Sequence, residues 1–369
     1  MRIKRLDITS LRIIESASVA TDASLVVFYG GNASGKTSVL EAIYTVCCGR
    51  SFRTRRNSQL INEHSHGYLV RALVETSSGS APKTIQLATE LKQKQKPRFR
   101  MGSEDARASQ LATLFPIQLV DASIFDLVDG SPSHRRRFYD WGMFHVKHEF
   151  YPLWKKHRKL AAHWNALLRR QAKPTDFDHW RNQFVEASER LAQMRLDYLE
   201  SLISMASSPG QALDSAELFG GQVELSLNRG WPDGLSYSDH LDASLEKDLR
   251  ERRLRSGAHF FDLNMMLDGK PVREVLSRGQ MKLLGLKLKL AQIKLYNALL
   301  DRSSCVVLVD DLAAEVDLEN QKRAVREILA AGSQVFFTTV DQAQLKAVVP
   351  EGVDTKMFHV KQGAITELA

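Results

Sequence analysis

The strongest constraint on the fold of this chain is a glycine-rich segment at residues 30–37, GGNASGKT. An apolar run, 25–29, leads into this segment, and a run with helical spacing, 39–44, follows it. Between a strand and a helix, the spacing G-x-x-x-x-G-K-[ST] lets backbone N–H groups surround a β-phosphate. The lysine then reaches the β and γ oxygens, and the threonine hydroxyl ligates Mg²⁺. The segment therefore predicts a nucleoside triphosphate site in an α/β fold.

The residues expected to bind the nucleotide are those of the loop and the first helical turn. They are Gly30, Gly31, Asn32, Ala33, Ser34, Gly35, Lys36, Thr37 and Ser38. Among them, Lys36 is expected to contact the phosphates and Thr37 to hold Mg²⁺. A glycine turn before a helix is the alternative for the segment taken alone.

The charge of the chain indicates an anionic partner because its basic residues are clustered. The net charge is +8, from 51 Lys and Arg against 43 Asp and Glu, in a chain of 369 residues. Any one cluster can be a solvated surface, but five clusters on a triphosphate-binding protein favour nucleic acid. The clusters lie at 50–56, 92–100, 135–137, 155–159 and 250–255.

The compartment is expected to be the reducing cytoplasm. The three cysteines, Cys47, Cys48 and Cys305, form neither a disulfide framework nor a C-x-x-C metal pair, and we expect them in the core. No apolar run is long enough to span a bilayer, and the N-terminus reads as an amphipathic strand rather than a signal peptide. No membrane partner is expected.

Strand and helix patterns predict two lobes, as the length of the chain also favours. Alternating strands and helices at both ends predict one nucleotide-binding lobe, residues 1–118 and 286–369, with a mixed β portion before the insertion. The inserted residues 119–285 read as a helical lobe. They carry a short helical hairpin at about 147–206, broken near 173–176, with arms expected to span roughly 40 Å.

Two carboxylates follow an apolar run near the C-terminus. The run VVLV at 306–309 leads directly into Asp310 and Asp311. At the end of a buried strand, Asp310 would hold Mg²⁺, and Asp311 would orient or deprotonate the attacking water as a general base. An acidic turn after a core strand is the alternative.

A third element is the segment LSRGQ at 276–280, which precedes a long helical pattern. Ser277, Gly279 and Gln280 offer a hydroxyl, free N–H groups and the positive end of a helix dipole, which suit a γ-phosphate. Taken alone, the segment is a helix N-cap.

Together with the loop and the aspartates, LSRGQ resembles the signature motif of ABC-type ATPases. The resemblance implies an ABC-type ATPase head that binds ATP in a head-to-tail, ATP-dependent homodimer. In such a dimer the motif of one subunit closes over ATP held by the other. The resemblance also implies a D-loop at 312–317 and a Q-loop glutamine, Gln118, with a catalytic and metal-binding role.

The motifs narrow the match further, and in their order along the chain they resemble the bacterial RecF family. They are EAIY at 41–44, GRSFRT at 49–54, GSP at 130–132, Arg135 with Arg136, FYDWG at 138–142, LSRGQ at 276–280 and DDL at 310–312. The resemblance implies an SMC-like ABC ATPase that binds DNA as an ATP-bound dimer. It also implies that the protein works with RecR and RecO to help load RecA at single-strand gaps, with weak, DNA-stimulated ATP hydrolysis.

Some positions depart from the family pattern. Gly31 stands where the family has Glu, and Ala33 replaces a common Gly; both keep the loop small. Phe260 replaces the Arg of a Gly-Pro-His-Arg segment. Thr338 and Thr339 stand where transporter ATPases carry a switch histidine, which is consistent with slow hydrolysis.

Several alternatives compete with this function. A transporter ATPase is disfavoured because Lys36 and Ser277 are 241 positions apart, and a zinc-hook protein because no long coiled coil with C-x-x-C is present. A non-hydrolysing DNA-binding module remains open, since Asp311 is one methylene shorter than the usual Glu, as does another SMC-like DNA-repair ATPase. The first choice for binding DNA, in a gap or the adjoining duplex, is Arg50, Arg53, Arg55 and Arg56, with structural ion pairs as the alternative.

Overall fold

The computed structural model describes residues 1–369 except 77–81, 207–218, 301–303, 313–314, 341–346 and 369. It divides into two compact units, one of Met1–Ile124 with Leu288–Ala369 and one of Phe125–Lys287. The first division falls after Ile124 rather than at 118, because the strand β8 (Ile117–Val120) pairs with β12 (Val306–Val309) in the first unit. Residues 313–314 of the expected D-loop lie outside the described residues.

The first unit contains a six-stranded sheet built from both ends of the chain. Its order is β15-β14-β3-β13-β12-β8, and every neighbouring pair is parallel except β14 and β15. All four residues of β12 and all five of β13 are buried, as expected of central parallel strands. The other bounds are β3 Leu25–Tyr29, β13 Val335–Thr339, β14 Thr355–Lys361 and β15 Ala364–Glu367.

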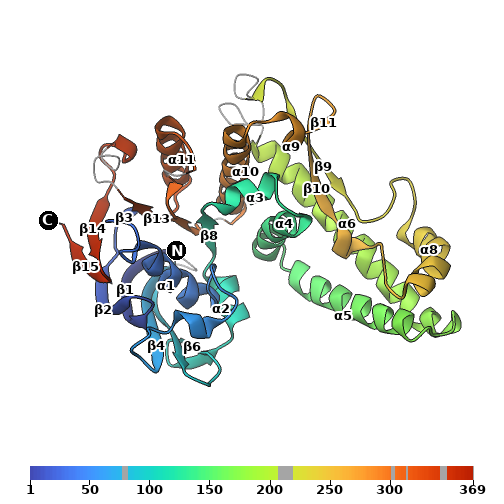
Figure 1. Ribbon diagram of the computed structural model, residues 1–369, viewed down its shortest axis with the longest axis horizontal. Coiled ribbons are helices and arrows are strands. Elements are labelled where there is room, and N and C mark those ends of the chain that lie inside the picture. Colours follow the sequence, from blue (N-terminus) through green and yellow to red (C-terminus); the bar gives the residue numbers. More distant parts are fainter. Residues whose placement is uncertain (77–81, 207–218, 301–303, 313–314, 341–346, 369) are drawn as a thin grey trace. The chain divides into compact units, whose positions relative to one another are not determined.

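A second sheet of the same unit is antiparallel, in the order β2-β1-β4-β5-β6-β7. One core joins it to the parallel sheet through the helix α1 (Lys36–Cys48), since Leu6, Leu40 and Phe336 belong to the same buried cluster. Figure 1 shows the N-terminal strands in blue beside the C-terminal strands in red. The bounds are β1 Arg2–Leu11, β2 Ile14–Ala20, β4 Gly67–Thr76, β5 Lys83–Lys92, β6 Arg98–Met101 and β7 Glu104–Ala106.

One glutamine ties the two ends of the chain together. The Gln334 Nε2 donates to the carbonyls of Ile3, Thr21 and Ala23, at 2.8 to 3.0 Å. Its Oε1 accepts from the Ile3 N–H at 2.7 Å, and the side chain is buried. The amide is therefore fully used in joining the segment before β13 to the N-terminal sheet.

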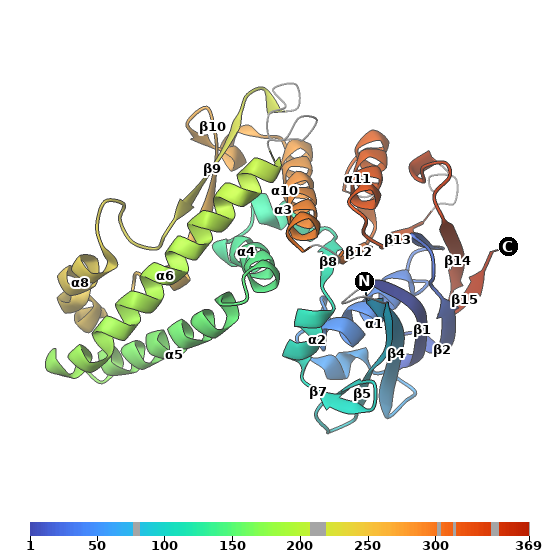
Figure 2. The ribbon, with the colours of Figure 1, turned by 180° about the vertical axis from the view of Figure 1, so that it is seen from behind.

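The second unit is mainly helical. Helices α5 (Phe150–Arg169) and α6 (Thr175–Ala206) form the expected hairpin, which Figure 2 shows side by side. The arms are unequal: at about 1.5 Å per residue, 20 residues extend about 30 Å and 32 residues about 48 Å. The unit also contains α4 Pro132–Val146, α8 Tyr237–Glu251, α9 Val272–Val275 and the strands β9 Val223–Asn228, β10 Asp262–Leu267 and β11 Lys270–Pro271.

Helix α10 (Arg278–Leu299) begins in the second unit and ends in the first. The remaining helices are α2 Ala108–Leu114, α3 Ser123–Val128, α11 Leu318–Ala330 and the 3₁₀ turns η1 Asn57–Leu60 and η2 Ala258–Phe260. Among the described residues, no helix is long and apolar enough to cross a membrane. Cys47 and Cys305 are buried and all three cysteines are free thiols.

Candidate nucleotide-binding site

The glycine-rich loop lies between β3 and α1, and its backbone requires glycine at two positions. Gly30 has φ +155°, and a Cβ there would lie 2.2 Å from the Val360 carbonyl oxygen. Gly35, just before α1, has φ +115°. Both values fall where side chains are disfavoured. The Gly363 N–H donates to the Ser34 carbonyl at 2.8 Å, so the β14–β15 turn braces the loop.

The two departures in the loop differ physically. Gly31 has open space around its α-carbon, so the missing Glu side chain leaves no packing defect. Ala33 has φ +59°, a left-handed conformation that strains a residue with a Cβ by about 1–2 kcal/mol. The family glycine would adopt this conformation without strain.

Lys36 lies against its own loop. Its Nζ donates to the carbonyls of Gly30 at 2.7 Å and Gly31 at 2.8 Å, and the residue is buried. Burial lowers the pKa of Lys36, while Asp311 and Asp310 raise it. These two aspartates therefore lie close enough to act on the ammonium, as the sequence predicts for one phosphate site.

Two hydroxyls converge on one carboxylate. The Thr37 Oγ1 donates to Asp310 Oδ1 at 3.0 Å, and the Thr338 Oγ1 donates to the same oxygen at 2.8 Å. Burial raises the pKa of Asp310, and these two hydrogen bonds lower it. A hydroxyl and a carboxylate side by side are oxygen ligands of the kind that Mg²⁺ prefers, so Thr37 and Asp310 fit that ion.

Thr338 also holds the residue that follows Asp310. Its Oγ1 accepts from the Asp311 N–H at 3.0 Å, and Asp311 has φ +49°. The side chain of Asp311 is exposed. The predicted general base is thus fixed by its backbone in an unusual conformation while its carboxylate faces solvent near Lys36.

The structure does not bring Gln118 to this cluster, contrary to the expected Q-loop role. Gln118 pairs with Val307 within β8, three residues and about 10 Å before Asp121. Its Nε2 donates to Gln292 Oε1 of α10 at 2.7 Å, and only 2% of the residue is exposed. In this position the Gln118 amide contacts Gln292 rather than Thr37 or Asp310.

Asp121 takes the place at the carboxyl end of β8 and was not predicted. The Asp310 N–H donates to the Val120 carbonyl at 2.9 Å, so the residue after Val120 lies beside Asp310. Asp121 contributes to raising the pKa of Asp310. It also opposes the effect of burial on Lys289 of α10, whose pKa burial lowers to about 8. The sequence contains a signal for Asp121: it directly follows the strand residues 117–120, just as Asp310 directly follows the strand residues 306–309.

The predicted signature residues lie at the start of α10, in the second unit. Ser277 Oγ accepts from the Gln280 N–H at 3.2 Å, and Gln280 Oε1 accepts from the Ser277 N–H at 2.9 Å. This reciprocal pair is a capping box. Ser277 and Gly279 are exposed, and Gly279 has open space at its α-carbon. The segment is therefore an ordered helix start that presents small groups to solvent.

The arginines expected to bind DNA divide into two pairs. Glu41 of α1 is fully buried and accepts two hydrogen bonds from Arg12 at 3.0 Å; Arg53 Nη1 lies 3.8 Å from Glu41 Oε2. Arg50 hydrogen-bonds the Tyr44 side chain. Arg55 and Arg56 are exposed and, within the described part of the chain, form no ion pair. Contacts within the protein thus explain part of the role of Arg53 and Arg50. They explain no role for Arg55 and Arg56.

Comparison with known proteins decides the family. Residues 2–366 match a family model described as RecF/RecN/SMC N terminal domain. DNA replication and repair protein RecF of Hahella chejuensis is 33% identical over 376 residues, with 100% of both chains covered. RecF of Shewanella sp. strain W3-18-1 is also 33% identical, with 99% of both chains covered. This chain belongs to the RecF family.

Solved structures agree on the fold. The chain superposes on the recombination mediator protein RecF-ATP of the RecFOR pathway with a TM-score of 0.84, 21% identity and coverage of 100% and 98%. An SMC head bound to the C-winged helix domain of ScpA follows with a TM-score of 0.58, 15% identity and the same coverage. The predicted fold class, an α/β ABC-type ATPase head, is confirmed.

The RecF-family segment at 257–260 packs inside the second unit. Gly257 has φ +123°, and a Cβ there would lie 2.6 Å from the Tyr237 hydroxyl, so glycine is required. The Ala258 carbonyl accepts a hydrogen bond from Arg195. Phe260, in place of the expected arginine, is 44% exposed and lies against His259, with ring centroids 4.4 Å apart and planes tilted by 43°. An exposed ring at this position removes a cation from the surface without disturbing the packing.

Proposed function

We propose that this RecF-family chain is an ATP-dependent DNA-binding protein of recombinational repair. ATP binding drives head-to-tail dimerisation on gapped or adjoining duplex DNA, and slow hydrolysis releases the DNA. One observation carries this proposal: Lys36, Thr37, Asp310 and Asp311 gather at the carboxyl ends of parallel strands, where α/β sheets bind ligands.

The chemistry follows from these groups. Lys36 neutralises the β- and γ-phosphates, and Thr37 with Asp310 holds Mg²⁺, which supplies charge neutralisation at the phosphates. Asp311 orients the attacking water and accepts its proton. Asp311 has one methylene less than Glu and its side chain is exposed to solvent. Its carboxylate therefore positions the attacking water poorly, which supports weak ATPase activity.

The other half of the site comes from a second copy. Ser277, Gly279 and Gln280 start α10 in the second unit, with Ser277 and Gly279 open to solvent, and the loop belongs to the first unit. In the dimer, these residues of one copy contact the γ-phosphate held by the other. ATP thereby becomes part of the interface, and its hydrolysis loosens the dimer.

Membership of the RecF family supports a set of partners. The ATP-bound RecF that shares this fold is named as a mediator of the RecFOR pathway. We infer RecR and RecO as partners, RecA loading at single-strand gaps as the outcome, and the cytoplasm as the location.

Sedimentation of the chain with ATP and a gapped duplex tests the proposal. The wild type should form a dimer and a DNA complex only with ATP, and Lys36→Ala should lose both. Ser277→Arg should keep ATP binding by the monomer and lose the dimer, whereas Ser277→Thr, which keeps the hydroxyl, should retain it. A normal ATP-dependent dimer of Ser277→Arg would contradict the shared site.

ATP turnover with and without DNA separates this function from a non-hydrolysing DNA-binding module. The proposal expects slow turnover that DNA accelerates. Turnover that is absent in both conditions, with DNA binding intact, would favour the module.

A further inference from the structure

Apart from the cluster at 50–56, whose contacts are described above, the structure sorts the basic clusters by what their cations contact. The cluster at 135–137 is largely structural. Arg135 forms two hydrogen bonds with the Asp262 carboxylate, at 2.7 and 2.9 Å, and a third with the Gly130 carbonyl. Arg136 donates to the Phe261 carbonyl at 3.0 Å. Such cations hold the second unit together and are not free to bind an external anion.

Two further clusters are partly neutralised by neighbouring carboxylates. In the β5–β6 hairpin, Lys92 lies 3.4 Å from Glu90 and Arg100 lies 3.6 Å from Asp105. At the end of α8, Glu251 contacts both Arg253 and Arg255. These acids reduce the net positive charge that either surface presents to a polyanion.

Helix α5 differs because its own sequence supplies no acid to its outer face. The helix contains no Asp or Glu between Phe150 and Arg169. Its buried side lies against α6, and the opposite side carries five exposed residues of basic or small type. These residues are Lys155, Arg158, Lys159, Ala162 and Ala166, and Arg169 continues the face at the end of the helix.

These positions form one stripe. At about 100° per residue, Lys155, Lys159 and Arg169 lie within about 80° of one another, roughly opposite the buried His157. Ala162 and Ala166 lie between the cations, so the middle of the stripe has no bulky side chain. At about 1.5 Å per residue, the stripe from Lys155 to Arg169 is about 21 Å long.

An aromatic pair lies at the N-terminal end of this stripe. The guanidinium of Arg158 lies 4.7 Å from the centroid of the Trp154 ring, and the rings of Tyr151 and Trp154 stack at 6.2 Å. Tyr151 is 38% exposed. Stacking on Trp154 restrains Arg158, which reduces the entropy lost when it meets a phosphate.

We propose that the outer face of α5 binds the phosphate backbone of DNA. The inference rests on the proposed DNA-binding function and assigns it a surface. Among the described residues, Lys155, Arg158, Lys159 and Arg169 form no ion pair, although Arg158 lies close enough to Asp140 to lower the pKa of that carboxyl. The stripe therefore keeps most of its positive charge for a polyanion. At about 3.4 Å per nucleotide of a strand, a 21 Å stripe matches about six consecutive nucleotides.

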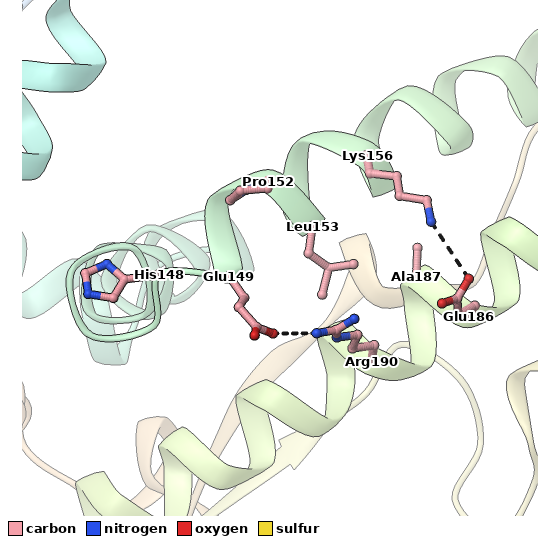
Figure 3. Close-up of a pocket in the computed structure, with 8 residues that line it drawn as sticks. All are labelled: His148, Glu149, Pro152, Leu153, Lys156, Glu186, Ala187 and Arg190. Carbon is pink, nitrogen blue, oxygen red and sulfur yellow. Dashed lines mark hydrogen bonds and ion pairs between the residues drawn. The ribbon is translucent and has the colours of Figure 1, made fainter.

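The inner edge of the same helix provides a matched contrast. A hollow of about 460 Å³ lies between α5 and α6. Figure 3 shows Lys156 facing Glu186 and Arg190 facing Glu149 there. The Lys156 Nζ lies 3.8 Å from Glu186 Oε2, and Arg190 hydrogen-bonds Glu149. These two cations, Lys156 on α5 and Arg190 on α6, are paired with acids, unlike the cations of the stripe. They supply a control in which the same number of charges is removed.

The experiment compares two double variants of the full chain, Lys155→Gln/Lys159→Gln and Lys156→Gln/Arg190→Gln. Binding of a gapped duplex with ATP is measured at several salt concentrations. Each lost phosphate contact lowers the slope of log K against log salt by about 0.9. The outer-face variant should therefore lose about 1.8 of slope and the inner-edge variant almost none. Adding Arg169→Gln should remove about 0.9 more.

The possible outcomes are distinct. Equal slopes for the outer-face variant and wild type, with wild type binding DNA, overturn the inference. Equal slopes together with lost binding of a protein partner also overturn it, in favour of a protein-docking face. A wild type that binds no DNA overturns the proposed function itself. Tryptophan fluorescence like that of the wild type shows that the second unit of each variant is folded, since all five tryptophans lie there.

Discussion

The two units use charged residues in opposite ways. In the first unit, Asp310 and Asp311 follow the buried strand β12, partly open to solvent, and both act on the ammonium of Lys36. In the second unit, Arg195 is fully enclosed: its guanidinium lies 3.6 Å from the Phe261 ring centroid and 3.8 Å from Asp140. Burial lowers the pKa of Arg195 to about 10. A charge at a strand end is open to a ligand, whereas a charge enclosed among aromatic rings holds a fold together.

The largest effect is expected at Asp311. Asp311→Asn should lower ATP turnover about 10²- to 10⁴-fold, because a general base contributes that much, and should leave ATP affinity unchanged. Asp311→Glu, which keeps the carboxylate, serves as the control and should retain turnover. Measured kcat and ATP Kd decide the outcome; a lost affinity with intact kcat would mean that Asp311 binds rather than reacts.

Arg195→Met tests the opposite role in the second unit. The variant leaves Asp140 without its buried cation and should destabilise this unit by about 3–5 kcal/mol. All five tryptophans lie in the second unit, so tryptophan fluorescence during urea unfolding reports on it specifically. Arg190→Met on the same helix, with an exposed cation, should change stability by less than about 1 kcal/mol. Equal effects of the two variants would contradict the contrast.

Acid should weaken the second unit through its buried histidines. Burial, with His259 and Arg195, lowers the pKa of His157 to about 3, and burial lowers that of His259 to about 4. Between pH 6.5 and 4 the unfolded chain therefore binds more protons than the folded one, so stability falls as the pH falls. Each histidine contributes about 1.4 kcal/mol per pH unit.

The same fluorescence measurement checks this dependence. His157→Gln should remove part of the slope below pH 6, whereas His148→Gln, at an exposed position, should leave the slope as it is. A slope that survives replacement of His157 would assign the acid sensitivity to other groups.

The smallest effect is expected at Thr338. Thr338→Val removes the donor to Asp310 and the acceptor for the Asp311 N–H. Turnover should fall about tenfold, since a hydrogen bond to a charged group contributes about 1.5 kcal/mol or more. The Mg²⁺ concentration needed for tight ATP binding should rise as well. Thr338→Ser should behave like wild type; a Thr338→Val enzyme with normal Mg²⁺ dependence would remove Thr338 from the site.

The sequence predicted the parts of the site that depend on local pattern. Lys36 and Thr37 follow from the loop spacing, and Asp310 follows from an apolar run that ends in a carboxylate. That Gln118 lies away from Asp310 was not foreseen, because its position depends on the register between β8 and β12, which are far apart along the chain. Asp121 was missed for the same reason.

The fold shows the same division between local and distant information. Strands such as β3 and β12, and the helical hairpin, follow from hydrophobic periodicity. The short, charged strands β6 and β7 were not predicted, because they bury little apolar surface and are held by pairing with β5. The sequence likewise could not tell that Arg135 is paired and Arg55 is not. The partner of Arg135 is Asp262, which lies 127 positions away along the chain.

The two-ended sheet also determines when the protein can assemble during synthesis. Strand β3 lies between β13 and β14, so residues 25–29 have no sheet partners until the chain reaches residue 335 and beyond. At about 5–20 residues per second, the ribosome takes roughly 15–60 s to make the intervening 305 residues, 30–334. The contiguous second unit emerges earlier and can fold first. The parallel sheet that carries the nucleotide site is thus completed only after the second unit has been synthesised.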